Sequence, residues 1–206
     1  MVEMADSIEL RIIDLIKRSR RGRIYFAENF LLFGNSKTVN KALERLTQKG
    51  ELRRVATGLY ARPIIDPVIG PVNPSIDAIA RAISRRDRAR IIPSGDYALN
   101  LLGLSTQVPL QVVYLTDGSS RNVKIGKRSI TFVHTSPKYL SVKGELSGLA
   151  LQALRTLGKN RIDDDEIFKI QEILKNEEKA HLEHDKLLAP AWIRKIFDSV
   201  LNQPRE

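Results

Sequence analysis

Amide, hydroxyl and cationic side chains recur between residues 35 and 45 at the spacing of one helical face. Val39, Leu43 and Leu46 follow at i, i+4 and i+7, so they mark the opposite, buried stripe. Amides suit adenine edges, cations suit guanine edges or phosphates, and hydroxyl groups at a helix start suit phosphate oxygens. The pattern therefore predicts a helix that reads the major groove of DNA. Its candidate contact residues are Asn35, Ser36, Lys37, Thr38, Asn40, Lys41 and Arg45.

Capping and turn residues indicate where this helix begins and ends. The N-cap candidates are Asn35, Ser36 and Thr38. Gly50 can adopt the left-handed conformation that ends a helix. The order of the surrounding elements is typical of a winged helix-turn-helix, which we expect over residues 1–65. Those elements are a helix over 7–18 capped by Ser7, a strand at 24–26, a helix over 27–32, and strands at 52–55 and 59–62 joined by Thr57-Gly58.

Further cations flank the expected reading helix. In a winged helix the hairpin contacts an adjacent groove or the backbone, so Arg53, Arg54 and Thr57 would be the wing contacts. Arg21 and Arg23 stand at the exit of the first helix. They could contact phosphates beside the reading helix, or they could be a solvated cationic helix end. Both interpretations stay open at this point.

Composition favours a polyanionic partner and excludes several other classes of protein. The 206 residues carry a net charge of +10, with pI ≈ 9.9. The basic excess lies before residue 160, and the remaining tail is acidic. A basic excess alone gives only non-specific, salt-dependent affinity for nucleic acid. There is no cysteine, no signal peptide and no apolar run near the ~18 residues of a membrane span, so we expect a cytoplasmic protein.

The remaining polar motifs indicate no enzymatic or metal chemistry. No phosphate-binding glycine loop occurs, and Ser94, as a possible nucleophile, would lack a nearby histidine base. His181 and His184, at i, i+3 beside Glu177 and Asp185, could be a zinc pair. They lack metalloprotease spacing and a third fixed ligand, so a polar exposed helix segment is favoured. We expect no metal, no cofactor and no catalytic residue.

A proline-rich stretch divides the chain. The composition changes over residues 64–74, and three prolines there favour an extended connector, with a domain boundary at 66–74. Residues 75–206 would form a second, mixed helical domain with a small antiparallel sheet, so the fold class is α+β. Its expected helices are 75–86 (capped by Ser75), 97–102 (capped by Ser94 or Asp96), 144–157, 163–175 and 191–201. Its expected strands are 91–93, 110–116, 122–125 and 129–134, with a hairpin turn at 117–120.

The second domain also carries clustered cations. They are either a solvated basic face or a second phosphate-binding surface. The residues concerned are Arg81, Arg85, Arg86, Arg88, Lys124, Lys127 and Arg128.

Two stretches resemble a known family. Residues 21–63, RGRIYFAENFLLFGNSKTVNKALERLTQKGELRRVATGLYARP, resemble the N-terminal winged helix of AbiEi-type antitoxins from bacterial abortive-infection toxin–antitoxin pairs. The G-x-Y-x-x-P ending of that wing is here Gly58, Tyr60 and Pro63. The stretch IPSGDYALNLLGLSTQVPLQVVYLTDGSSRNVKIGKRSITFVHT resembles the antitoxin's second domain, as found in DUF6088-like proteins. The likeness covers most of residues 7–160.

The resemblance implies a transcriptional repressor that doubles as an antitoxin. Such a protein binds inverted repeats in its own promoter and neutralises a nucleotidyltransferase-like toxin, either directly or without a stable complex. The alternative is an adaptor whose winged helix binds protein instead of DNA. An enzyme acting on nucleic acid is a weaker alternative, because paired carboxylates and a histidine base are missing from the basic blocks. The acidic helical tail after residue 160, a departure from the family, could be core or a partner surface.

Overall fold

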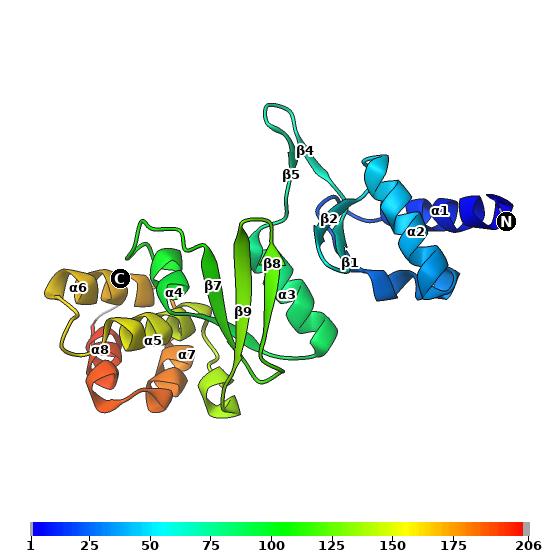
Figure 1. Ribbon diagram of the computed structural model, residues 1–206. Helices are drawn as coiled ribbons and strands as arrows, with labels where there is room; N and C mark the ends of the chain where they lie inside the picture. Colours follow the sequence, from blue (N-terminus) through cyan, green and yellow to red (C-terminus); the bar gives the residue numbers. More distant parts are fainter. Residues whose placement is uncertain (1, 204–206) are drawn as a thin grey trace. The chain divides into compact units, whose positions relative to one another are not determined.

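The computed structural model describes residues 2–203, and their side chains from Ile8 onward (Figure 1). Two compact units divide the chain: residues 1–83 with 124–126 (unit 1), and residues 84–123 with 127–206 (unit 2). The division falls within helix α3 (Ile76–Asp87), after the stretch predicted as the connector. Ser75 caps α3 as predicted, because its hydroxyl oxygen accepts from the Ala78 backbone N–H at 3.1 Å.

Unit 1 begins with the predicted order of helices and strands. The helix predicted between α1 and α2 is a 3-10 helix, η1, of 7 residues. Strands β1, β3 and β2 form an antiparallel sheet with β3 in the centre. The predicted cap Ser7 lies outside the residues with described side chains, and α1 begins before it. The elements are α1 Val2–Lys17, β1 Ile24–Phe26, η1 Ala27–Phe33, α2 Ser36–Gln48, β2 Arg53–Ala56 and β3 Leu59–Ala61.

Local sequence fixes both ends of α2. The Asn35 side chain accepts a hydrogen bond from the Thr38 backbone N–H at 3.0 Å, which confirms Asn35 as the N-cap. At the other end Gly50 has φ 74°, and its N–H donates to the Thr47 carbonyl at 3.1 Å. The Glu51 N–H donates to the Leu46 carbonyl at 3.0 Å. These two bonds are the Schellman motif, which satisfies the last carbonyl groups of the helix.

The predicted stripe of α2 forms the centre of the unit 1 core. Val39, Leu43 and Leu46 are completely buried. They pack with Ile12 of α1 and Phe30 of η1, which are equally buried. Burying a side chain of this size stabilises a fold by roughly 1.5–3 kcal/mol, so the stripe determines which face of α2 points outward.

The proline-rich stretch after β3 folds back on itself, which corrects the prediction of a simple connector. Strand β4 (Ile64–Asp66) pairs with β5 (Gly70–Val72) in an antiparallel hairpin (Figure 1). The Asp66 carboxylate accepts from the N–H groups of Val68 and Ile69 at 2.8 and 3.0 Å, and Gly70 has φ 76°. This turn chemistry, in which a short acidic side chain closes the turn, reverses the chain.

Unit 2 confirms the α+β class. Helix α4 contacts β6 and β7 of its sheet, and helix α5 contacts β6. Apart from Lys124–Gly126, the elements after α3 belong to this unit. They are β6 Ile91–Ser94, α4 Asp96–Leu101, β7 Gln111–Thr116, β8 Arg121–Ile125, β9 Arg128–His134, η2 Pro137–Leu140, α5 Glu145–Leu157, α6 Asp164–Leu174, α7 Lys179–Asp185, η3 Lys186–Leu188 and α8 Ala191–Leu201.

The four-stranded sheet of unit 2 has the order β6-β7-β9-β8. The pair β6–β7 is antiparallel, whereas β7 and β9 are parallel, with Gln111 opposite Ser129. The turn predicted at 117–120 therefore does not join neighbouring strands. Strand β9 takes the inner position because it buries Ile130 and Phe132, while no residue of β8 is buried.

The helices after residue 160 are core elements. Leu174 of α6 and Phe197 of α8 are completely buried against Leu154 of α5. The start of α6 is a capping box, in which Asp163 accepts from the Glu166 N–H at 2.7 Å and Glu166 accepts from the Asp163 N–H at 3.2 Å. Sequence reasoning was wrong about the cap of α4, where Gly95 is the N-cap and no side chain bonds to the helix start.

Candidate nucleic-acid interface

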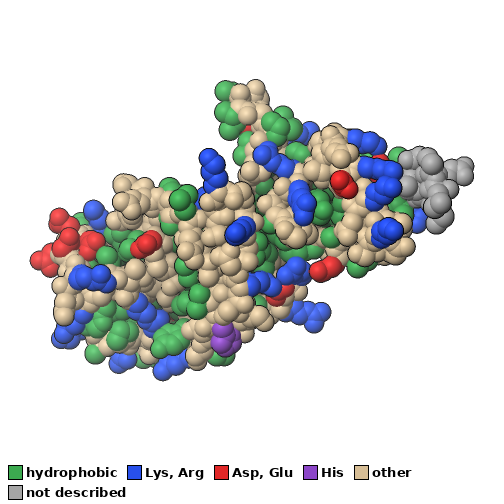
Figure 2. All heavy atoms as spheres, in the orientation of Figure 1, with side chains coloured by type: hydrophobic (Ala, Val, Ile, Leu, Met, Phe, Trp, Pro, Cys, Tyr) green, Lys and Arg blue, Asp and Glu red, His purple; other side chains and the backbone are tan. Residues whose placement is uncertain are grey.

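The outward face of α2 presents polar and cationic side chains to solvent. Lys37, Asn40 and Lys41 are exposed, and neither lysine forms an ion pair with a described residue. The Asn40 amide donates only a long hydrogen bond, 3.4 Å, to the Ser36 hydroxyl. Figure 2 shows Lys and Arg side chains over the part of the molecule that contains α1 and α2. These side chains can therefore meet a ligand without first breaking an internal ion pair.

The start of α2 is capped by neutral groups only. The Asn35 carboxamide takes the Thr38 N–H, and the Thr38 hydroxyl donates to the Asn35 backbone carbonyl at 2.9 Å. Asn35 and Thr38 are thus used within the cap, although both are exposed. No acidic residue stands in the first turn. The positive end of the helix dipole is consequently not balanced by a carboxylate of that turn.

Arg45, predicted to contact DNA, is engaged inside the protein. Its guanidinium donates to the Glu9 carboxylate at 3.1 Å, and Lys49 donates to the same carboxylate at 2.8 Å. Glu9 of α1 is 4 % exposed. The hydrogen bond from Lys49, reinforced by that from Arg45, lowers the pKa of Glu9 from its ordinary value against the opposing effect of burial. Arg45 therefore connects α2 to α1. The residues of the outward face of α2 that remain open to a ligand are Lys37, Asn40 and Lys41.

The residues predicted as wing contacts, Arg53, Arg54 and Thr57, differ in whether the protein itself engages their side chains. The Arg53 guanidinium donates to the Pro71 carbonyl of β5 at 3.0 Å, so it supports the second hairpin. Arg54 and Thr57 are exposed. Gly58 has φ 71° in the tight turn between β2 and β3. Of these three candidates, Arg54 and Thr57 remain available to a ligand.

The two arginines after α1 lie at the edge of the unit 1 sheet. Arg21 and Arg23 are exposed, and the Arg23 guanidinium stacks 5.3 Å from the centre of the Tyr25 ring. The Gly22 N–H between them donates to the Arg62 carbonyl at 2.9 Å, which fixes this segment beside the end of β3. Hydrogen bonding thus holds their backbone while both side chains stay open to solvent.

The predicted second basic surface is only partly free. Arg81 pairs with Asp77 at 2.7 Å, and Arg86 pairs with Asp87 at 2.8 Å. Arg128 is half-buried and donates to the Pro109 carbonyl at 3.3 Å. The exposed members without an ion pair to a described residue are Arg85, Arg88, Lys124 and Lys127. The seven residues are also divided between the two units.

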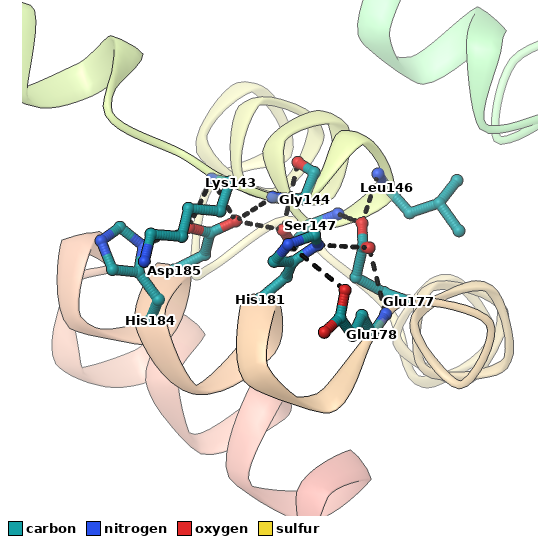
Figure 3. Close-up of polar contacts among 9 residues, drawn as sticks. All are labelled: Lys143, Gly144, Leu146, Ser147, Glu177, Glu178, His181, His184 and Asp185. Carbon is teal, nitrogen blue, oxygen red and sulfur yellow. Dashed lines mark hydrogen bonds and ion pairs between the residues drawn. The ribbon is translucent and has the colours of Figure 1, made fainter.

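The predicted histidine and carboxylate group, Glu177, His181, His184 and Asp185, lies beside the start of α5 (Figure 3). Asp185, completely buried, accepts from the backbone N–H groups of Lys143 and Gly144 at 2.8 and 2.9 Å. Its other polar neighbours are the Ser147 hydroxyl and His184 Nδ1, the latter at 2.7 Å. Asp185 therefore binds the backbone at the beginning of α5.

Glu177 completes this arrangement. Its carboxylate accepts from the N–H groups of Leu146 and Ser147 at 2.8 and 3.2 Å, and His181 Nδ1 lies 3.3 Å away. Burial would raise the pKa of Glu177, but the hydrogen bonds from the backbone and from His181 outweigh it, and the net pKa is lowered. The two histidines thus contact different carboxylates. Among the described residues, no group of three or more potential ligands could hold a metal ion.

A model of the family described as "Family of unknown function (DUF6088)" matches residues 11–182. This range is most of the chain, and it includes the candidate DNA contacts and the predicted second basic surface. The chain belongs to the DUF6088 family. No match to it was found among curated proteins. Among solved structures, it is similar to the crystal structure of the RV2827C protein from Mycobacterium tuberculosis. The two share 12% identity and a TM-score of 0.47, over 97% of this chain and 82% of that one.

Sequence reasoning missed two features of unit 1. Glu9 recurs with Ile12 and Ile16 at helical spacing, so its position on the inner face of α1 predicts a buried carboxylate that needs a cationic partner. The turn residues of the β4–β5 hairpin were also present in the sequence.

No helix within the described residues is long and apolar enough to cross a membrane.

Proposed function

We propose that this DUF6088 protein is a sequence-specific DNA-binding repressor whose unit 1 is a winged helix-turn-helix. The observation that carries the proposal is the outward face of α2, where Lys37, Asn40 and Lys41 are exposed and neither lysine pairs with a described carboxylate. A helix in the major groove reads base edges with such side chains. The order of elements in unit 1 supports the same proposal.

The proposed contacts fall into two groups. Asn40 would read a base edge, since a carboxamide can bond adenine in two places. Lys37, Lys41, Arg54 and Arg21 would hold phosphates, which position the protein but carry no sequence information. Arg45 is left out of the reading group because of its ion pair with Glu9.

Substitution of Asn40 and Lys37 tests the two roles separately. Asn40→Ala should relax the preference at one base pair by about 1–3 kcal/mol while leaving the salt dependence unchanged. Lys37→Ala should weaken binding to all sequences alike. Both are measured by gel shift against a fragment of the chain's own promoter and a shuffled fragment of equal length. Unchanged discrimination by the Asn40 variant would remove it from the reading group.

We further propose that the protein acts as the antitoxin of an abortive-infection pair with a nucleotidyltransferase-like toxin. This part rests on the resemblance to AbiEi-type antitoxins, not on the geometry of unit 1. Co-expression with the product of the adjacent reading frame tests it. Restored growth in the presence of this chain would support the proposal, while persistent toxicity, or the absence of such a gene, would contradict it.

A further inference from the structure

Among the unit 1 residues with described side chains, the two most exposed large apolar side chains lie on the β4–β5 hairpin, which we call the arm (residues 64–72). Val68 is 91% exposed, Ile69 74% and Ile65 51%. In Figure 2 hydrophobic side chains gather at the tip of this hairpin. Exposed apolar side chains that stand together on a protruding element mark an interaction site more often than scattered ones do.

The arm is anchored at its base. Gly22 lies directly under the Ile64 side chain, because a Cβ at that glycine would stand 2.7 Å from the terminal carbon of Ile64. Arg53 holds the Pro71 carbonyl at 3.0 Å. An isolated two-stranded hairpin is marginally stable in water, so these contacts supply support that the arm itself lacks. They connect the arm to β2 and to the segment before β1, within unit 1.

The charge distribution argues against a nucleic-acid partner for the arm. No lysine or arginine occurs between Arg62 and Arg81. Asp66 is the one ionisable residue of the arm, and the N–H groups of Val68 and Ile69 hold its carboxylate. These bonds lower the pKa of Asp66 and keep it anionic at neutral pH. Phosphate contact needs cations, and the arm has none to offer.

The same distribution favours a second copy of this chain. A protein with a net charge of +10 repels its own copies, and this repulsion is weakest where cations are absent. The arm lies within residues 63–80, the longest stretch of unit 1 without a lysine or arginine. A two-fold interface joins identical patches, so an apolar patch without cations can meet its copy with no contact between cations, and the two Asp66 carboxylates are its only charges. We infer that the arm is the self-association surface of this protein and pairs with the arm of a second copy.

A contact made by two arms is small, so the dimer should be weak in solution. If unit 1 binds DNA as proposed, the arm would add cooperativity between two half-sites. The association itself does not depend on that function, and the two can fail independently.

Sedimentation velocity of the full chain at increasing concentration tests the inference without DNA. The arm variant is Val68→Ser with Ile69→Ser, at a turn where both side chains are largely exposed. The matched control is Leu31→Ser with Leu32→Ser, which changes two exposed leucines of η1 in the same unit. The wild type and the control should show a concentration-dependent dimer, and the arm variant should dissociate at least about tenfold more readily. An unchanged melting temperature confirms that each variant is folded.

Three results would overturn the inference. They are a wild type that stays monomeric at every concentration, an arm variant that associates like the wild type, and a control that loses association equally. Affinity for a single half-site separates this inference from the proposed function. The arm variant should keep that affinity, and its loss would make the arm a DNA contact instead. Failure of all variants to bind DNA would contradict the proposed function and leave the arm's role intact.

Discussion

The first backbone N–H groups of helices α2 and α5 are bound by opposite kinds of acceptor. Each helix begins with backbone N–H groups that need acceptors. In α2 the neutral Asn35 caps the helix, the first turn contains no acid, and the surrounding side chains are exposed. In α5 two carboxylates, Glu177 and Asp185, come from distant sequence to bind those groups in a buried setting.

The difference indicates which helix start can receive a ligand. Two anions already compensate the dipole of α5 and fill the space, since a Cβ at Gly144 would collide with the Glu177 carboxylate. The start of α2 keeps its positive end near Lys37, with no carboxylate in its first turn. An external phosphate at α2 would play the role that Asp185 plays at α5.

Among substitutions at the two helix starts, removal of the Asp185 charge should reduce the unfolding free energy most. Asp185→Asn weakens charge-assisted bonds to buried donors, and we expect unit 2 to lose on the order of 3 kcal/mol of unfolding free energy. Trp192, the single tryptophan, lies in α8 and reports urea unfolding of unit 2 by fluorescence. The control Asp165→Asn, at an exposed site, should stay within about 0.5 kcal/mol. Equal effects of the two variants would refute the buried-cap account.

Glu177 should make unit 2 sensitive to acid. Its pKa in the folded state lies below the ordinary 4.5, so its stabilising contribution is complete above that value. The contribution is lost as the pH falls from 4.5 through the lowered pKa. Glu177→Gln should therefore flatten the pH dependence of the unfolding free energy in this range, as followed by Trp192 fluorescence. A slope identical to that of the wild type would contradict the assignment.

The neutral cap of α2 should contribute less. Asn35→Ala removes the acceptor for the Thr38 N–H and should cost about 1 kcal/mol of unit 1 stability. Hydrogen exchange of peptides covering α2 measures this locally. Ser36→Ala, next in the chain but not the cap, is the control and should leave the exchange within about 0.5 kcal/mol of the wild type. If both variants exchange alike, Asn35 does not determine where α2 starts.

Local signals in the sequence were sufficient for α2. Its buried stripe, its cap at Asn35 and its stop at Gly50 all lie within the helix or next to it, and all three are confirmed. Helix α8 was likewise predicted with its observed bounds. Periodicity and capping are short-range properties, so one sequence is enough to recognise them.

Features that depend on distant residues could not be predicted in this way. The bond from Arg45 to Glu9 joins residues in separate helices. Residue type alone had led to the prediction that Arg45 contacts DNA. The parallel pairing of β7 with β9 skips β8, whereas a hairpin is the default for successive strands. Asp185 binds the Gly144 N–H at the start of α5 from 41 residues further along the chain. The DNA-binding role of the exposed α2 residues stays a prediction.

Salt dependence of DNA binding tests the central proposal most directly. Lys37→Ala with Lys41→Ala removes two charges from the open face of α2, and the control Lys169→Ala with Lys195→Ala removes two from exposed sites in α6 and α8. With a promoter fragment, we expect the first pair to weaken binding and to reduce the slope of log K against log salt by about 2, at roughly 0.9 per phosphate contact. The control should keep the wild-type slope. Equal slopes for both pairs, or no binding by the wild type at moderate salt, would contradict the proposal that α2 presents its open face to DNA.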